Sequence, residues 1–253
     1  MDKGKLYLVG IGPGDKENMT FKAFRVIREC NVIVGYKRYI ELLQELQEEQ
    51  QENLLEGKKI ISSPMRNEEE RCRRAIGEAV QGGKVALVSS GDAGIYGMAG
   101  IALQILEKET FTLEVEVVPG ITAASAAAAL LGAPLMHDFA VISLSDLLTP
   151  WELIEKRLRQ AGEGDFVVVL YNPRSRGRVT QMERAQELLS CYRNEGTPVG
   201  IVRNAFRQGE SKTVTVLGQI LEHDMDMATV VVIGNSQSYV NEELFITPRG
   251  YPL

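Results

Sequence analysis

The chain has 253 residues, of which 44% are hydrophobic and 25% are charged, a composition typical of a globular protein with one large or two small domains. Its net charge of −6 and pI of about 5.2 argue against a general nucleic-acid binder, which would carry a basic face, so an anionic ligand would need local arginines or backbone amides. The three cysteines stand far apart without a CxxC pair, so we expect no cysteine-based metal site and a reducing cytoplasmic compartment. The N-terminal residues and the length of the apolar runs lead us to expect no signal peptide and no membrane span.

Apolar runs of strand length alternate with helical segments through the first half of the chain. In the clearest helix Cys72, Ala75, Ile76, Ala79 and Val80 recur at the spacing of one helical face, and two glycines end it. The other expected elements are strands at 6–12, 31–35, 85–90 and 114–118 and helices at 21–30, 38–57 and 100–109. This order and the near-continuous apolar strands predict a mainly parallel sheet with helices on both faces.

The second half also alternates strands and helices but ends differently. We place a boundary at Pro119–Gly120, which divides the chain into α/β domains at 1–119 and 120–253. Residues 211–217 alternate polar and apolar residues, as does a strand with one wet face. The expected elements are helices at 122–132, 150–160 and 179–192 and strands at 139–145, 166–172, 199–202, 211–217 and 229–235. We therefore expect a mixed sheet in this domain.

Four glycine-rich or polar turns follow apolar strands, which is where open α/β sheets bind ligands. They are GIGPGD at 10–15, SSGDAGIYG at 89–97, VVPGIT at 117–122 and LYNPRSRGR at 170–178. The first turn lacks the GK[ST] of a phosphate-binding loop and misplaces the third glycine of a dinucleotide-binding turn. Alone it equally fits a tight strand–helix connection. In the third turn, helix packing and capping explain the small residues and Thr122.

Single charged residues in these turns are candidates for chemistry. Asp92 could accept hydrogen bonds from a ribose or an ammonium group, or could cap the next helix; the flanking glycines favour ligand binding. Arg174, Arg176 and Arg178 could bind carboxylates or form a solvated basic loop. His137, one of two histidines, could carry a proton or be purely structural.

Taken together, these segments resemble the tetrapyrrole methylase family over nearly the whole chain. GIGPGD, SGDAGIYG, VVPGIT, the Asn-Pro turn and TVVVIGN stand in the order and spacing of that family. SGDAGIYGMAG, HDFAVISLSDLLTPWE and LYNPRSRGR are most similar to members that methylate ring carbon 17 of precorrin-3B or its cobalt form and contract the ring during cobalamin biosynthesis. Members that act on other carbons usually have SGDPxxYG where this chain has Ala93.

The resemblance implies two α/β domains with S-adenosylmethionine in the cleft between them, a tetrapyrrole substrate and a homodimer, without nucleic acid, membrane or a protein-held metal. The implied cofactor contacts are Pro13, Gly91, Asp92, Ile95, Thr122, Ala123, Asn172, Ala205 and Thr229. Our candidates to bind the carboxylates of such a substrate are Arg174, Arg176 and Arg178, with Arg66, Lys37 or Arg38 as further candidates. For the ring contraction, His137 is the first candidate acid–base and Asp92 the second, while Ser89 could orient a carbonyl.

Three further functions stay open on the sequence alone. One is methylation of a different precorrin carbon. Another is a nicotinamide-dependent oxidoreductase that uses GIGPGD as its dinucleotide loop, against which the displaced glycine speaks. The third is a binding or scaffold protein without catalysis, against which the four turns speak.

Overall fold

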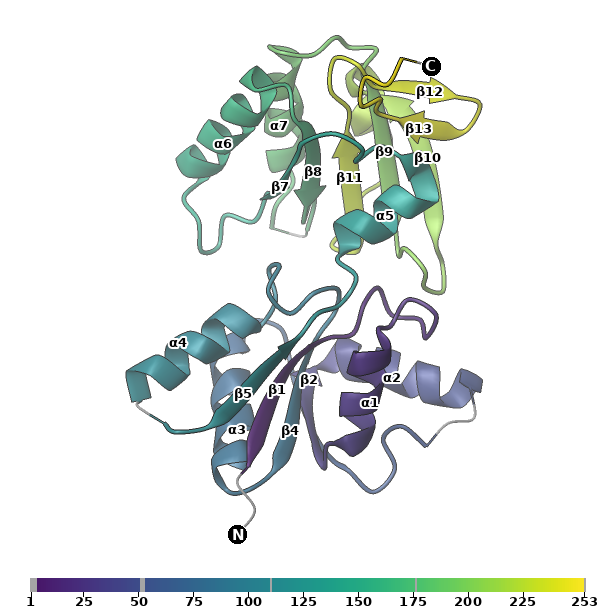
Figure 1. Ribbon diagram of the computed structural model, residues 1–253. Coiled ribbons are helices and arrows are strands. Elements are labelled where there is room, and N and C mark those ends of the chain that lie inside the picture. The colour runs from purple at the N-terminus through teal and green to yellow at the C-terminus, as the bar shows by residue number, and fades with distance from the viewer. Residues whose placement is uncertain (1–3, 51–52, 110, 176, 253) are drawn as a thin grey trace. The chain divides into compact units, whose positions relative to one another are not determined.

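The structure, a computed structural model, describes residues 4–50, 53–109, 111–175 and 177–252 (Figure 1). The chain divides into two compact units, Met1–Ala123 and Ala124–Leu253. Each unit has its own five-stranded sheet and its own hydrophobic core. In the part of the chain that is described, no helix is both long and apolar enough to cross a membrane.

The sheet of the first unit is parallel throughout, as the sequence predicts. Its strand order is β3-β2-β4-β1-β5. The strands are β1 (Lys5–Gly10), β2 (Val32–Tyr36), β3 (Lys59–Ser63), β4 (Lys84–Ser89) and β5 (Glu114–Val118). The carboxyl ends of β4, β1 and β5, three neighbouring strands, therefore share one edge of the sheet.

Helices cover both faces of this sheet (Figure 1). They are α1 (Phe21–Glu29), α2 (Lys37–Gln50), α3 (Glu68–Val80) and α4 (Ala99–Glu109). The side chains of α1 and α2 pack on one face and those of α3 and α4 on the other, because successive strand residues point to opposite faces. Thr20 caps α1, since its hydroxyl accepts a hydrogen bond of 3.1 Å from the Ala23 amide.

Two features of the first unit differ from the sequence prediction. The helix expected over 38–57 ends at Gln50. Leu54 and Leu55 are buried, and the Leu55 amide donates to the Gln47 side chain at 2.7 Å, so the chain turns back to place both leucines in the core instead of continuing the helix. Strand β3 was not expected, because its two isoleucines are too short an apolar run to predict a strand.

The sheet of the second unit is mixed, as expected, with the order β10-β9-β11-β8-β7. Strands β7 and β8 are parallel, whereas β11 is antiparallel to β8 and β9, and β10 is antiparallel to β9. The strands are β7 (Phe139–Ser143), β8 (Val167–Tyr171), β9 (Pro198–Arg203), β10 (Ser211–Val216) and β11 (Thr229–Ile233). The carboxyl ends of β7, β8 and β9 thus lie at the same edge as the start of β11.

Helices α6 (Trp151–Glu163) and α7 (Gln181–Ser190) pack together on one face of the mixed sheet. The 3₁₀ helix Leu217–Glu222 joins this core. Helix α5 (Ala123–Leu131) contributes Leu131, whose side chain occupies the space beside Gly200 of β9.

A small third sheet in the second unit was not expected from the sequence. It has the order β12-β13-β6 and consists of β6 (Gly132–Ala133), β12 (Tyr239–Asn241) and β13 (Leu244–Ile246). The buried Phe245 pairs with Gly132 in parallel, so the C-terminal segment is tied to the end of α5. These strands have two or three residues each, too few for a recognisable alternation.

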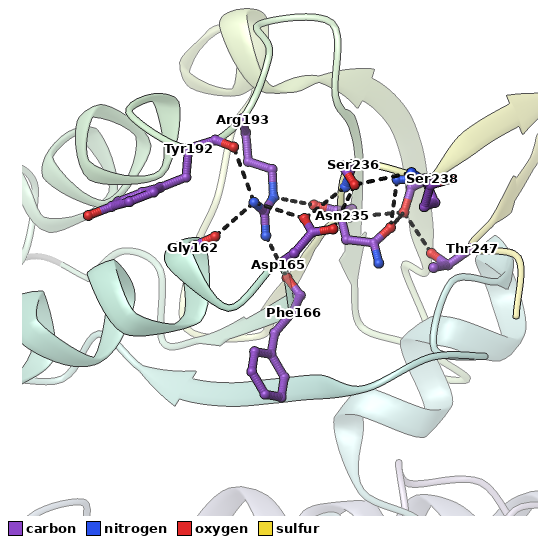
Figure 2. Close-up of polar contacts among 11 residues, drawn as sticks. Gly162, Asp165, Phe166, Tyr192, Arg193, Asn235, Ser236, Ser238 and Thr247 are labelled. Atoms are coloured by element: carbon purple, nitrogen blue, oxygen red, sulfur yellow. Dashed lines mark hydrogen bonds and ion pairs between the residues drawn. The ribbon is translucent and has the colours of Figure 1, made fainter.

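A buried arginine holds the amino end of β8 to its surroundings (Figure 2). Arg193 donates to the carbonyl oxygens of Gly162 at 2.9 Å and Phe166 at 3.1 Å. It also donates to the carbonyl of Gly234 at 3.3 Å and pairs with Asp165 at 3.0 Å. Burial lowers the pKa of Arg193, and the charge of Asp165 partly opposes that shift. This network supports the edge of the mixed sheet at which β8 begins.

Candidate functional site

Three glycines bring the loops after β1, β4 and β5 into contact. A Cβ atom on Gly10 would lie 2.6 Å from the carbonyl oxygen of Gly91 and 2.7 Å from the amide of Gly120. A Cβ atom on Gly120 would meet the backbone of both Gly91 and Gly10. Only glycine fits such approaches, and the resulting edge consists largely of backbone atoms.

Gly12 and Gly91 lock two of these loops together. The Gly91 amide donates to the Gly12 carbonyl at 2.7 Å, and the Gly12 amide donates to the Gly91 carbonyl at 3.1 Å. Both residues have positive φ angles, 71° and 68°, which favour glycine. The two loops are therefore held together by their own backbone.

The carboxylate of Asp92 connects the β4 loop to the β5 loop. Its Oδ1 accepts from the Gly94 amide at 2.8 Å, and its Oδ2 accepts from the Gly120 amide at 3.0 Å. Asp92 is half-buried, and both of these amides lie in loops and not in the first turn of α4, so Asp92 does not cap that helix, which the sequence also allowed. Each carboxylate oxygen has a further lone pair available for a ligand.

The other residues expected to contact the cofactor in the first unit lie at the same edge. Pro13 is buried in the β1 loop, and Ile95 is exposed in the β4 loop. Thr122 and Ala123 come within 3.8 Å of the position that a Cβ atom on Gly91 would occupy. The structure thus brings all the expected residues of this unit to one edge, next to Asp92.

Ser89 is also at this edge but faces inward. Its side chain is buried, and its hydroxyl accepts the Met98 amide at 3.1 Å. The Ser89 carbonyl accepts the amide of Ile11 at 2.9 Å. Both bonds shape the loops, and the expected role of Ser89 in orienting a carbonyl stays a prediction.

In the second unit, Asn172, Ala205 and Thr229 share one edge of the mixed sheet. Asn172 directly follows β8 with φ 56°, and its side chain donates to the Ser143 hydroxyl at 2.9 Å. Thr229 opens β11 opposite Arg203, the last residue of β9, and Ala205 follows that strand by two residues. The register of the strands therefore gathers these three residues.

Thr229 is buried and bonded to Asp226. The Thr229 hydroxyl accepts the Asp226 amide and donates to the Asp226 carboxylate, both at 3.0 Å. Burial raises the pKa of Asp226, but hydrogen bonds from the Ala228 amide, Arg203 and Thr229 outweigh it, and the net pKa lies below the ordinary value. The Thr229 hydroxyl is thus already occupied, and so is its amide, which donates to the Asp226 carbonyl at 3.3 Å.

Arg178 is an internal support and not an open anion clamp. Only 4% of it is exposed, and it donates to the Asn172 carbonyl at 3.1 Å, the Ser145 hydroxyl at 3.2 Å and the Met227 sulfur at 3.0 Å. Burial lowers its pKa, and the charge of Asp146 partly opposes that shift. A side chain held in this way orders the loops after β7 and β8, which argues against direct binding of a substrate carboxylate.

The other two arginines of the basic turn are not equivalent. Arg174 is half-buried, and its Nε atom is buried without a hydrogen-bond partner. It lines a pocket of about 590 Å³ together with Ser175 and residues 225–228. Arg176 lies outside the described residues. Of the two arginines of this turn that the structure describes, Arg174 is the one that lines a pocket.

His137 lies at the opposite end of the mixed sheet. It precedes β7, and its neighbour Asp138 accepts the amide of Val167, the first residue of β8, at 3.1 Å. Ser143, the last residue of β7, stands five residues after Asp138, which corresponds to about 16 Å of extended chain. The Nδ1 atom of His137 accepts a hydrogen bond of 2.8 Å from the Asp138 amide. This placement argues against His137 as a proton carrier at the edge that holds Asn172.

A family model of the tetrapyrrole (corrin/porphyrin) methylases matches residues 5–221. The chain belongs to this family. A probable cobalt-factor III C(17)-methyltransferase of Salmonella typhimurium is 49% identical over 98% of this chain and 100% of its own length. The cobalt-factor III methyltransferase of Priestia megaterium is 48% identical over 98% of this chain, which spans 45% of that longer protein.

A solved structure of a family member agrees with both sheets. The crystal structure of the methyltransferase CobJ matches with a TM-score of 0.88 and 36% identity, over 97% of this chain and all of that one. The expected α/β architecture, with a parallel sheet followed by a mixed sheet, is confirmed, and so is the resemblance to this family. Among the described residues, no group of three or more His, Cys, Asp or Glu side chains could hold a metal ion.

Sequence reasoning missed two residues that organise these edges in this methylase. The Tyr171 hydroxyl at the end of β8 accepts the Ala124 amide at 2.7 Å, and so satisfies one free donor in the first turn of α5. Buried Arg71 of α3 donates to the Ser63 hydroxyl at 2.9 Å and to the Pro64 carbonyl at 2.8 Å, which holds the end of β3. Tyr171 lies in one of the four turns, so its position could have drawn attention to it. Arg71 is one of several charged residues on a helix, and nothing in the sequence distinguishes it from the others.

Proposed function

We propose that the protein transfers a methyl group from S-adenosylmethionine to ring carbon 17 of precorrin-3B or its cobalt form, with ring contraction, in cobalamin biosynthesis. The observation that carries the proposal is the backbone-lined edge around Gly10, Gly91 and Gly120, with Asp92 beside it. Family membership and the two relatives, whose names both specify cobalt-factor III, support the reaction and favour the cobalt form.

The residues of the chain fit the cofactor chemically. S-adenosylmethionine presents ammonium, ribose hydroxyl and sulfonium groups, which suit a carboxylate and backbone carbonyls, and an adenine and a carboxylate, which suit backbone amides. In the first unit we assign the contacts to Pro13, Gly91, Asp92, Ile95, Thr122 and Ala123. In the second unit we assign them to Asn172, Ala205 and Thr229.

When bound, the cofactor supplies an activated methyl group as the electrophile. The main task of the chain is then to hold the accepting carbon and the methyl group in line and to exclude water. Rigid loops suit that task, and the Gly12–Gly91 pair and the Asp92 hydrogen bonds hold these loops to one another. We assign Arg174, which lines a pocket, to a carboxylate of the substrate.

Ring contraction also requires proton transfer. Of the three candidates, Ser89 is buried and bonded, and His137 precedes β7 at the far end of the sheet. Asp92 is the candidate whose carboxylate lies at a loop edge and has unused lone pairs. We therefore propose Asp92 as the group that transfers the proton.

The deciding experiment is an anaerobic assay with both forms of the substrate. We expect one methyl group added at ring carbon 17 and a contracted ring, read by product mass and NMR. A product methylated at another carbon would assign a sibling activity. Calorimetric titrations with S-adenosylhomocysteine and with NADH separate the remaining classes of protein. A methyltransferase would bind S-adenosylhomocysteine, a nicotinamide oxidoreductase would bind NADH, and a scaffold protein would bind neither.

We also propose a homodimer that acts in the cytoplasm. Support comes from the family resemblance and from the low cysteine content. Light scattering coupled to size-exclusion chromatography tests the dimer, with twice the mass of the 28.0 kDa chain as the expected result. Fractionation of cells that produce the protein tests its location.

A further inference from the structure

Two adjacent leucines stand exposed at the carboxyl end of β7. The segment 144–150 joins β7 to α6 and projects past the ends of the strands in Figure 1. At its tip, 64% of Leu147 and 94% of Leu148 is exposed. Two neighbouring leucines in solvent forgo the gain of burial, so an apolar occupant that covers them would bind favourably.

The base of this segment is held firmly. The Leu144 side chain is buried, and its amide donates to the Tyr171 carbonyl at 2.9 Å. The Ser145 hydroxyl accepts from Arg178, and the Asp146 carboxylate accepts from Gln181 at 2.9 Å. The leucines are thus presented by a fixed support and not by a loose loop.

Two further apolar side chains accompany the leucines around Arg178. Met227 is 43% exposed, and its sulfur accepts from the same guanidinium that binds Ser145 at the base of the leucine segment. Val179, the next residue after Arg178, is 63% exposed. We call Leu147, Leu148, Val179 and Met227 the apolar rim. It belongs to the edge that carries Asn172 and Arg174.

We infer that the apolar rim holds the face of the tetrapyrrole substrate, with Leu147 and Leu148 as its substrate-positioning residues. The inference rests on the proposed function. A tetrapyrrole has a flat apolar face and carboxylates around its perimeter, and this edge offers both complements, the exposed leucines and the cation of Arg174, which lines the same pocket as Met227. A purely apolar partner surface would leave that cation unmatched, which is why a small acidic macrocycle fits better than a second copy of the chain.

The test replaces both leucines by asparagine of similar size, Leu147→Asn with Leu148→Asn. We expect the KM for the substrate to rise by roughly tenfold or more, because two apolar contacts are lost. The Kd for S-adenosylhomocysteine, kcat at saturation and the melting temperature should stay unchanged, since the side chains lie in solvent. Leu148→Met alone should keep the KM near that of the wild type. Val80→Asn, at a 50% exposed position of α3, is the matched control.

Direct titration of the macrocycle, followed by its absorbance, keeps the inference separate from the proposed function. If the wild type binds the ring but methylates another carbon, the proposed function is wrong, and weaker ring binding by the double variant still supports the rim. An unchanged KM and unchanged ring binding in the double variant would overturn the rim. Dissociation of a dimer in the double variant would show an interface between copies, and it would overturn the rim as well. Absence of ring binding by the wild type overturns both.

Discussion

Asp92 and Gly120 are joined by a hydrogen bond of 3.0 Å across 28 residues of sequence. One carboxylate oxygen thereby holds the loop after β5, while the other holds Gly94 in its own loop. The residue that is expected to meet the cofactor is therefore also the residue that gives the site its shape. Any test of its chemistry must separate these two roles.

Asp92→Asn separates charge from shape. The amide keeps one oxygen acceptor but presents N–H groups where the carboxylate accepted, so one of the two bonds to Gly94 and Gly120 is lost. We expect the Kd for S-adenosylhomocysteine to rise about tenfold, in line with the loss of one charge-assisted hydrogen bond. Calorimetry measures it. Asp138→Asn, an exposed carboxylate, is the control and should leave the Kd unchanged.

Gly120→Ala tests the close packing of the loops. The new methyl group would press on the backbone of Gly91 and Gly10, which cannot shift independently. We expect a loss of about 1–3 kcal/mol in the free energy of unfolding, measured by denaturant titration. Gly100→Ala in α4, where a Cβ atom meets nothing within 4 Å, should instead stabilise by roughly 0.5–1 kcal/mol. Equal effects at the two positions would contradict the packing argument.

Arg178→Lys tests the internal support at the second edge. A lysine keeps the charge but cannot reach Asn172, Ser145 and Met227 together. We expect a loss of about 2–4 kcal/mol in the free energy of unfolding, because a buried cation is left poorly bonded. Arg203→Lys, in an exposed ion pair with Asp226, should cost less than about 1 kcal/mol. If Arg178→Lys is as stable as the wild type, Arg178 is free to bind substrate after all.

The low pKa of Glu116 predicts that the first unit becomes less stable as the pH falls below 4.5. Hydrogen bonds from Lys22 and Lys5 lower the pKa of its carboxyl from 4.5 to about 2. A depressed pKa in the folded state means that the contribution is fully present above pH 4.5 and is lost as the pH falls towards 2. Melting temperatures between pH 2 and 5 should show this slope in the wild type and a shallower one in Glu116→Gln. An identical slope in both proteins would remove Glu116 as its source.

His137→Ala decides between the sequence prediction and the geometry. A proton carrier would give normal cofactor binding and slow ring contraction. Because His137 precedes β7 and lies at the opposite end of that strand from the edge that holds Asn172, we expect both cofactor binding and product formation to be unchanged. Product mass in single-turnover assays gives the answer, and an uncontracted methylated product would restore His137 to the mechanism.

The glycine loops were the part of the site most open to prediction from the sequence. Apolar strands that end in glycines mark where the backbone can approach a ligand, and the register of neighbouring strands then gathers the loops, as it does for Gly10, Gly91 and Gly120. Burial was not predictable in the same way. Arg178 looked like one of three equivalent charges, yet contacts with Ser145 and Met227, distant in sequence, make it internal.

Short strands are the elements of the fold that could not be predicted from the sequence. The long helices and the buried strands carry enough residues for a clear period, and their places were predicted. Strand β3 and the three strands of the small sheet carry too few residues for a period, and their existence depends on tertiary pairing. The end of α2 was missed for a related reason, because Leu54 and Leu55 satisfy a helical pattern but are buried by a turn.

The pairing of Phe245 with Gly132 has a practical consequence for anyone who shortens this protein. Phe245 and Thr247 are both fully buried although they lie within ten residues of the last position, so removing them would open a hole beside α5 and strip β6 of its partner. A minimal stable fragment of the second unit must extend through Thr247, whereas a tag or a fused domain can be attached after the exposed Tyr251 without touching the interior.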